Sequence, residues 1–135
     1  MLDDNPARVE ALGECLSTLT PAPLFEIYQT AERFISGLPV TLPLAQLISL
    51  EHDLISKSEG DLHSGNGMEV ALELESAPAC SVILHTVNQE ACPAMAVALQ
   101  DHGWSVDRIA PVADGASWIP TLWLPKARDL LNSSG

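Results

Sequence analysis

Residues 68–87 constrain the fold most, because two kinds of strand pattern follow each other there. In residues 68–74, apolar residues alternate with glutamate and alanine, a period of two that is typical of a strand with one buried face. Residues 81–87 are apolar on both faces apart from His85, which suits a strand in the middle of a sheet. With a turn at residues 76–78, the pattern predicts a β-hairpin.

The chain after this hairpin predicts a helix and two more strands. Residues 94–102 form an alanine-rich helical stretch that stops at Gly103, and residues 104–109 and 118–124 are the strand candidates. Pro120 would place the last strand at a sheet edge, because proline has no N–H to donate to a neighbouring strand. The predicted order of this half is ββαββ.

The first half of the chain predicts three short amphipathic helices. Asn5 can cap the first, with Pro6 at its first position, and apolar residues recur at spacings of three and four up to Leu19. A second helix can start at Thr20, and a third spans residues 41–57. Such helices must pack on each other, on a sheet or on a second chain.

These elements predict an α+β fold with three parts. Residues 1–57 are the helical segment, and the glycine- and serine-rich residues 58–67 are a flexible linker. Residues 68–135 are the ββαββ unit, whose four strands form a mainly antiparallel sheet.

The acidic composition narrows the possible partners. The formal net charge is −12, from 18 acidic and 6 basic residues, so the surface repels nucleic acid and anionic membranes. The expected partner is another protein, which can be a basic one. The N-terminus lacks the apolar core of a signal peptide, and no apolar run reaches the length of a membrane span, so a cytoplasmic location is expected.

Cys92, followed by proline, is the sharpest chemical candidate. At a helix N-cap its thiolate would be stabilised by the helix dipole, and His85 could act as its base. The alternative is that Asn88 caps the helix and Cys92 is a packed core residue. The three cysteines have no regular spacing that would indicate a disulfide framework.

No metal site and no cofactor are expected. Zinc sites have characteristic spacings, and the histidines, cysteines and acids of this chain show none of them. The residues considered were His52, Asp53, His63, Cys80, His85, Cys92 and His102.

Two further groups of residues are candidates for partner binding. Glu69, Glu73 and Glu75 would form an acidic row on the first strand of the hairpin, although such a row also protects a sheet edge from unwanted pairing. Trp118 and Trp123 lie five positions apart on the predicted last strand and would point to opposite faces. One of the two would then be exposed or covered by a partner.

The leading hypothesis is a non-enzymatic, acidic protein-binding module of the adaptor, chaperone or inhibitor kind, which self-associates as a homodimer. Two alternatives stay open: a small thiol or small-molecule enzyme that uses Cys92 and His85, and a structural subunit of a larger assembly. No motif decides whether the chain is an enzyme, and the missing catalytic motifs favour that it is not.

Overall fold

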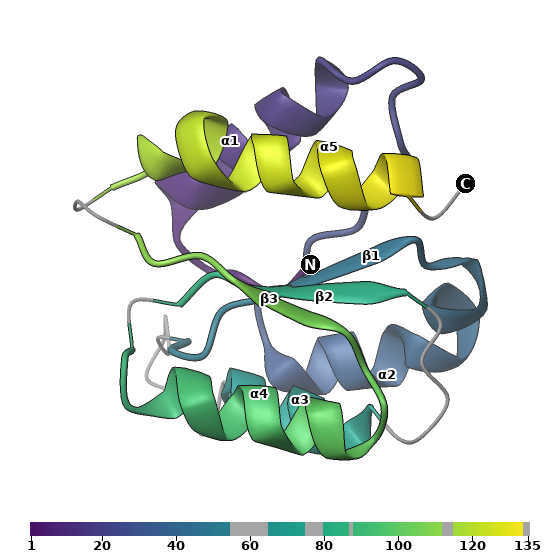
Figure 1. Cartoon of the computed structure of the whole chain (residues 1–135), viewed down its shortest axis with the longest axis vertical. Coiled ribbons are helices and arrows are strands. Elements are labelled where there is room, and N and C mark those ends of the chain that lie inside the picture. Colours follow the sequence, from purple (N-terminus) through teal and green to yellow (C-terminus); the bar gives the residue numbers. More distant parts are fainter. Residues whose placement is uncertain (55–64, 75–79, 87, 112–114, 134–135) are drawn as a thin grey trace.

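The computed structural model describes residues 1–54, 65–74, 80–86, 88–111 and 115–133. Its centre is a parallel sheet of three strands, β1 (Leu47–Leu50), β2 (Ser81–Leu84) and β3 (Val106–Arg108), in the order β1-β2-β3. Leu47 pairs with Ser81, and Val82 pairs with Val106. Parallel neighbours require a crossover between them, and helices supply these crossovers (Figure 1).

Two extended segments widen the sheet beyond β1. Leu2 forms parallel bridges to Leu50 on one side and to Tyr28 on the other. The Leu2 N–H donates to the Ser49 carbonyl at 2.9 Å, and the Leu2 carbonyl accepts from the Glu51 N–H at 3.0 Å. The spatial order is therefore the Tyr28 segment, the Leu2 segment, β1, β2 and β3. Numbered along the chain, this is the 2-1-3-4-5 order of the flavodoxin-like, doubly wound α/β fold.

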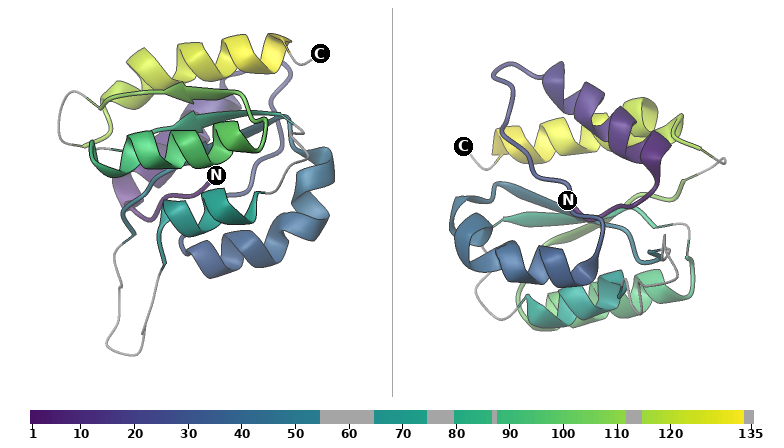
Figure 2. Two further views of the ribbon diagram at one scale, coloured as in Figure 1. Left: turned by 60° about the horizontal axis from the view of Figure 1, so that its bottom comes forward. Right: turned by 180° about the vertical axis from the view of Figure 1, so that it is seen from behind.

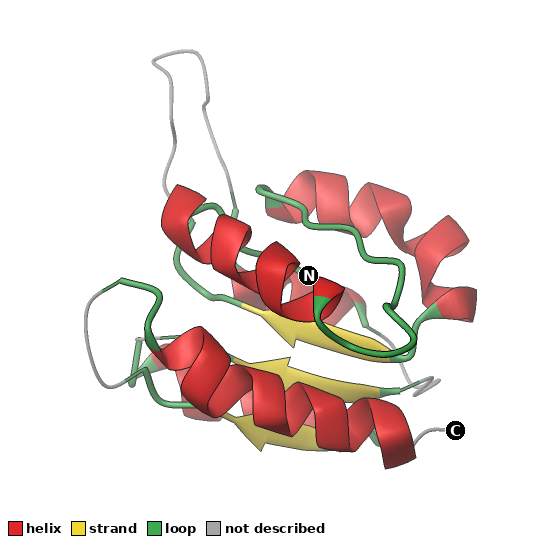
Figure 3. Cartoon of the chain, turned by 90° about the horizontal axis from the view of Figure 1, so that it is seen from above, coloured by secondary structure: helices red, strands yellow, loops and turns green. Residues whose placement is uncertain are grey.

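Helices cover both faces of the sheet (Figures 1 and 2). Helices α1 (Pro6–Ser17) and α5 (Leu124–Ser133) lie on one face. Helices α2 (Ala31–Thr41), α3 (Gly67–Glu73) and α4 (Ala91–Asp101) lie on the other. Seen from above, α1 and α5 lie in front of the sheet (Figure 3), and Figure 1 shows the sheet between the two helical layers. None of the helices in the described residues is long and apolar enough to cross a membrane.

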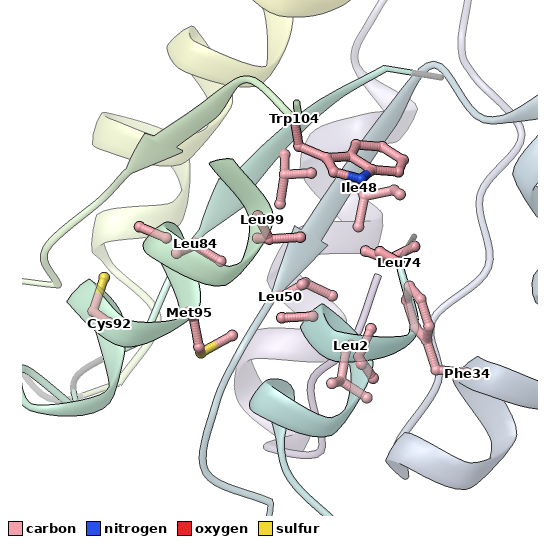
Figure 4. Packing of buried hydrophobic residues seen from close by; sticks show 14 of the residues in the cluster. Leu2, Phe34, Ile48, Leu50, Leu74, Leu84, Cys92, Met95, Leu99 and Trp104 are labelled. Carbon is pink, nitrogen blue, oxygen red and sulfur yellow. The ribbon is translucent and has the colours of Figure 1, made fainter. Parts of the chain in front are cut away.

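The alternation of side chains along the strands divides the core into two clusters. Ile48, Leu50, Val82 and Leu84 belong to a cluster with residues of α2, α3 and α4, part of which Figure 4 shows. Ile83 belongs to the opposite cluster, with residues of α1, α5 and the π-helical turn η2 (Ile119–Trp123). A strand that is apolar on both faces is expected where helices cover both, so this reading of the second strand is confirmed.

The predicted antiparallel α+β fold is wrong, and the reason begins at residues 68–74. They form helix α3 and its C-cap, not a strand. Asn66 caps the helix by accepting the Glu69 N–H at 3.1 Å. Val70, Ala71 and Leu74 are buried at helical spacing, while Leu72 is 58% exposed. In so short a segment, alternation does not distinguish one face of a strand from two turns of helix.

Two more predicted elements have the opposite structure. The expected helix at 41–57 contains strand β1. A run of four residues, of which the last three are buried, also suits a parallel strand covered on both faces. The expected strand at 118–124 is the turn η2 leading into α5. Pro120 lies in the first turn of η2, where a missing N–H does no harm, and Pro125 is the second residue of α5, which directly follows η2. They therefore do not mark a sheet edge.

The two predicted segments share one sheet. Strand β1 precedes the expected linker at 58–67, and it pairs with β2, which follows the linker. Most of the linker, residues 58–64, lies outside the described residues, so its flexibility stays a prediction. The predictions of α1 with its Asn5 cap, of α4 and of β3 are confirmed.

Candidate functional site

The polar residues of the sheet gather at its carboxyl edge. Asp3 follows the Leu2 segment, Glu51 follows β1 and His85 follows β2, and all three side chains are buried. Parallel strands end at one edge, so residues far apart in sequence meet there. The strand order reverses between the Leu2 segment and β1, which is where doubly wound sheets bind their ligands.

Asp3 is held by four donors, three of them from the N-cap and first turn of helix α1 and the fourth from His85. The Arg8 Nε donates to Asp3 Oδ2 at 2.9 Å, and the Arg8 Nη2 donates to Asp3 Oδ1 at 3.1 Å. The Asn5 N–H also donates to Oδ1, at 2.9 Å. The same short stretch that caps helix α1 thus fixes both the acid and its basic partner.

Glu51 differs from Asp3 because its two oxygens are not equally engaged. Oε1 accepts from the N–H groups of His52 at 2.7 Å and Asp53 at 3.2 Å. Oε2 is buried and accepts no hydrogen bond from the described part of the chain. The nearest cation is the Arg8 Nη2, at 3.5 Å from Oε2. Among the described residues, Oε2 is the one buried side-chain oxygen without a hydrogen bond, so it has capacity left for a ligand.

His85 connects the site to the turn η2, which precedes helix α5, through a chain of hydrogen bonds. Its Nε2 lies 3.0 Å from Asp3 Oδ2, and its Nδ1 lies 2.6 Å from the Ser49 Oγ. The Trp123 Nε1 donates to the same Oγ at 2.9 Å. A carboxylate can only accept, so Nε2 of His85 carries a proton, and in the neutral ring Nδ1 accepts the Ser49 hydroxyl.

The electrostatics of Asp3 follow from these contacts. Burial alone would raise the pKa of Asp3, but the hydrogen bonds from His85 and Arg8 outweigh it and lower the pKa to about 2. Burial likewise opposes the charge of Arg8, while its hydrogen bond to Asp3 and the charges of Asp3 and Glu51 raise its pKa. Asp3 and Arg8 therefore form a buried ion pair.

A second polar group lies beside the site and is more exposed. Asp53 Oδ1 lies 2.7 Å from the His52 Nδ1 and accepts from the Asn88 Nδ2 at 3.1 Å. These two hydrogen bonds lower the pKa of Asp53. Its side chain is 53% exposed, so Asp53 is a carboxylate at the rim and not part of the buried cluster.

The buried cluster has the donors of a site for a hard divalent cation. Ligand atoms of Asp3, Glu51 and His85 all lie within 4.8 Å of one another. Carboxylate oxygens suit Mg²⁺, and the free Oε2 of Glu51 gives such an ion a ligand that no other group uses. His85 is a weaker candidate because its Nε2 is bonded to Asp3. Asp3 and Glu51 would hold the ion.

Cys92 and His85, the candidate residues of the thiol-enzyme alternative, have different surroundings. Cys92 is buried in the cluster on the α2–α4 face, and burial raises the pKa of its thiol. A thiolate is therefore disfavoured at this position. Both ring nitrogens of His85 are engaged, with Asp3 and Ser49.

The predicted partner-binding residues are distributed between core and surface. Trp118 and Trp123 are both buried in the cluster on the α1 and α5 face, although alternation along a strand would have separated them. Glu69 and Glu73 lie on helix α3, where Glu73 is exposed and Glu69 is half-buried. Glu75 lies outside the described residues.

Sequence reasoning missed Asp3, Arg8 and Glu51 as a site. Asp3 lies just before the predicted first helix, and Glu51 lies within the helix predicted at residues 41–57, so neither position indicates a shared site. The available signal was positional: Glu51 and His85 each directly follow a short apolar run. If both runs are parallel strands, the residues after them meet at one edge.

Comparisons with solved structures identify the fold as that of receiver (REC) domains. No family model matches the sequence, and no curated protein sequence matches it. The response regulator domain of Thermotoga maritima CheB aligns over 97% of this chain and 92% of its own, with a TM-score of 0.68 and 13% identity.

Two further receiver structures agree with this fold. The phosphorylated cyanobacterial phytochrome response regulator RcpA has a TM-score of 0.70 at 16% identity, over 99% of this chain and 93% of its own. The isolated REC domain of RcsB from Salmonella enterica serovar Typhimurium, solved with the phosphomimetic BeF₃⁻, has a TM-score of 0.65 at 20% identity, over 98% and 85%. At these identities the likeness shows the fold.

This likeness overturns the predicted function. The interpretation as an adaptor, chaperone or inhibitor is wrong, and so are the thiol-enzyme and structural-subunit alternatives. They depended on a small antiparallel sheet with exposed tryptophans and a reactive Cys92. The structure has a receiver-like parallel sheet with an acidic site at its carboxyl edge instead.

Proposed function

We propose that the chain is a receiver-like signalling domain, regulated at the acidic site by a phosphoryl group and a divalent cation. Glu51 is the observation that carries the proposal, because its Oε2 is, among the described residues, the one buried side-chain oxygen without a hydrogen bond, and it lies at the edge where this fold binds ligands. Two of the similar structures are a phosphorylated response regulator and a REC domain with the phosphomimetic BeF₃⁻.

The chemistry requires a carboxylate oxygen that can attack phosphorus. Asp3 is a poor candidate because Arg8, His85 and the Asn5 N–H engage both of its oxygens. The Glu51 Oε2 can attack the phosphorus of an acyl phosphate, which forms a glutamyl phosphate and releases the donor's carboxylate. A bound Mg²⁺ would supply neutralising charge for the phosphoryl oxygens, and Arg8 lies close enough to contribute to it.

The domain would act by changing its binding to other proteins and not by turning over a substrate. The proposed partners are a kinase that supplies the phosphoryl group, such as a histidine kinase, and a protein that recognises the phosphorylated state. The cytoplasm is the proposed location, and self-association stays a prediction.

Phosphorylation by acetyl phosphate with MgCl₂ tests this proposal. Intact-mass measurement should show addition of one phosphoryl group to the wild-type chain and none to Glu51→Gln. The matched control is Asp53→Asn, which removes the exposed carboxylate two positions after Glu51. This variant should still take up one phosphoryl group.

Two outcomes would contradict the proposal. Labelling that survives in Glu51→Gln and disappears in Asp53→Asn would move the acceptor to the rim. If the wild-type chain takes no label and its amide NMR spectrum does not change with BeF₃⁻ and Mg²⁺, the site does not bind phosphoryl groups.

A further inference from the structure

Arg8 occupies the position where a cation would neutralise the acidic site. Its Nε and Nη2 contact both oxygens of Asp3, at 2.9 and 3.1 Å, and its Nη2 lies 3.5 Å from the Glu51 Oε2. Its side chain is only 15% exposed. One guanidinium group thus lies between the two acids that would bind a divalent cation.

The position of Arg8 is not explained by the helix that carries it. Arg8 is the third residue of α1, and its N–H donates to the Asn5 Oδ1 at 3.1 Å. A positive charge in the first turn of a helix is unfavourable, because the helix dipole is positive at that end. Asp3 and Glu51 must therefore hold the side chain in place.

The contact between Arg8 and Glu51 is too long for a hydrogen bond, which indicates that a different cation could also occupy this position. At 3.5 Å, Arg8 neutralises Glu51 Oε2 without a hydrogen bond, so this buried oxygen stays unsatisfied. Unsatisfied buried oxygens are rare in folded proteins. A cation of higher charge density, coordinated directly by Asp3 and Glu51, would satisfy it.

We propose that Arg8 is a tethered cation that substitutes for a divalent metal at Asp3 and Glu51, and that metal binds only when Arg8 is displaced. The site is then stable in two forms, one neutralised by Arg8 and the other by the metal. The inference rests on the proposed function in that both use Glu51 as the ligand group. It concerns cation choice and does not require phosphoryl transfer.

The test is the effect of MgCl₂ on Arg8→Gln. Without Mg²⁺ this variant should unfold at lower urea concentration than the wild type, because the two buried acids lose their counter-charge. With Mg²⁺ it should regain stability and bind the ion, by calorimetry, about tenfold or more tightly than the wild type. The wild type should gain little stability from Mg²⁺.

Arg33→Gln is the matched control. Arg33 is also the third residue of its helix, α2, and its N–H also donates to the N-cap side chain, here Thr30. It is exposed and makes no contact with the site among the described interactions. Its loss should leave both the Mg²⁺ affinity and its effect on unfolding as in the wild type.

Arg8→Lys separates charge from shape. It keeps the positive charge and loses the two-pronged contact with Asp3, so its Mg²⁺ affinity should stay well below that of Arg8→Gln. Equal Mg²⁺ affinity in the lysine and glutamine variants would contradict a competition between charges. If Arg8→Gln is unfolded without Mg²⁺, refolding upon addition of MgCl₂ supports the proposal, and failure to refold overturns it.

Equal Mg²⁺ affinity in the wild type and Arg8→Gln would also overturn this inference. The two proposals fail separately. A chain that shows the Mg²⁺ competition but accepts no phosphoryl group retains the tethered cation and loses the proposed function. If Glu51 is labelled and the wild type and Arg8→Gln bind Mg²⁺ with equal affinity, the proposed function is retained and the tethered cation is lost.

Discussion

The two faces of the central strands are built differently. Ile48, Leu50, Val82 and Leu84 point to the α2–α4 face, which is apolar throughout the strands. The opposite face carries Ile83 together with Ser49 and His85, which are hydrogen-bonded to each other, and the Ser49 Oγ also accepts from the Trp123 Nε1. One face therefore supplies burial, and the other also carries a polar connection from η2 to the acidic site.

This difference separates two ways of stabilising one sheet. On the apolar face, stability follows from the area removed from water and is insensitive to pH. On the polar face, stability depends on each buried donor and acceptor having a hydrogen-bond partner, so the loss of a single partner is strongly destabilising. Substitutions on the two faces should therefore differ in size and in pH dependence.

The largest effect is expected for Asp3→Asn. It removes the closest counter-ion of the largely buried Arg8, which keeps only the 3.5 Å contact with Glu51, and should lower the free energy of unfolding by about 3 to 5 kcal/mol. Asp107→Asn is the control, because Asp107 pairs with Lys126 at 3.6 Å on the surface. That exposed pair should contribute less than about 1 kcal/mol. Urea unfolding measures both, and similar losses would show that burial does not matter here.

Leu84→Ala is the corresponding test of the apolar face. Leu84 is fully buried, so its truncation should destabilise the fold by about 3 kcal/mol through lost burial and a cavity. Leu72→Ala removes the same atoms from an exposed position on α3 and should change stability by no more than about 0.5 kcal/mol. The Leu84→Ala loss should be the same at pH 7 and pH 3, and a strong pH dependence would contradict the division between the faces.

The pH dependence of the polar face follows from Asp3. Its pKa falls from an ordinary value of 3.8 to about 2 on folding, so the folded state binds this proton less tightly than the unfolded state. The resulting stabilisation, on the order of 2 kcal/mol, is fully present above about pH 4 and is lost as pH falls through about 2. Carboxyl ¹³C NMR titration of Asp3 checks the value directly. A midpoint near 4 would show that Arg8 and His85 do not hold the carboxylate.

Ser49→Ala should have the smallest of these effects, about 1 to 2 kcal/mol, because it leaves the Trp123 N–H and the His85 Nδ1 without their shared partner. Ser17→Ala, which removes an exposed hydroxyl bonded to the Gly13 carbonyl, is the control and should be nearly neutral.

A double-mutant cycle sharpens this last test. Once Trp123→Phe has removed the N–H donor, Ser49→Ala should be less costly than in the wild type. Additive losses would show that the two residues do not act through their hydrogen bond.

Much of the local structure could be predicted from the sequence. Asn5 and Pro6 determine the start of α1 because capping and proline preferences depend on neighbouring residues alone. The apolar residues 81–84 indicated a strand covered on both faces, and they form β2 at the centre of the parallel sheet. Such signals are local, so they survive without knowledge of the fold.

Only the tertiary structure decided the rest. Residues 47–50 and 68–74 are short enough to suit a helix or a strand, and packing made the first a strand and the second a helix. Strand direction depends on the crossovers and not on the strands themselves. The acidic site follows from that direction, because parallel pairing brings Asp3, Glu51 and His85 to one edge although 34 or more positions separate them in sequence.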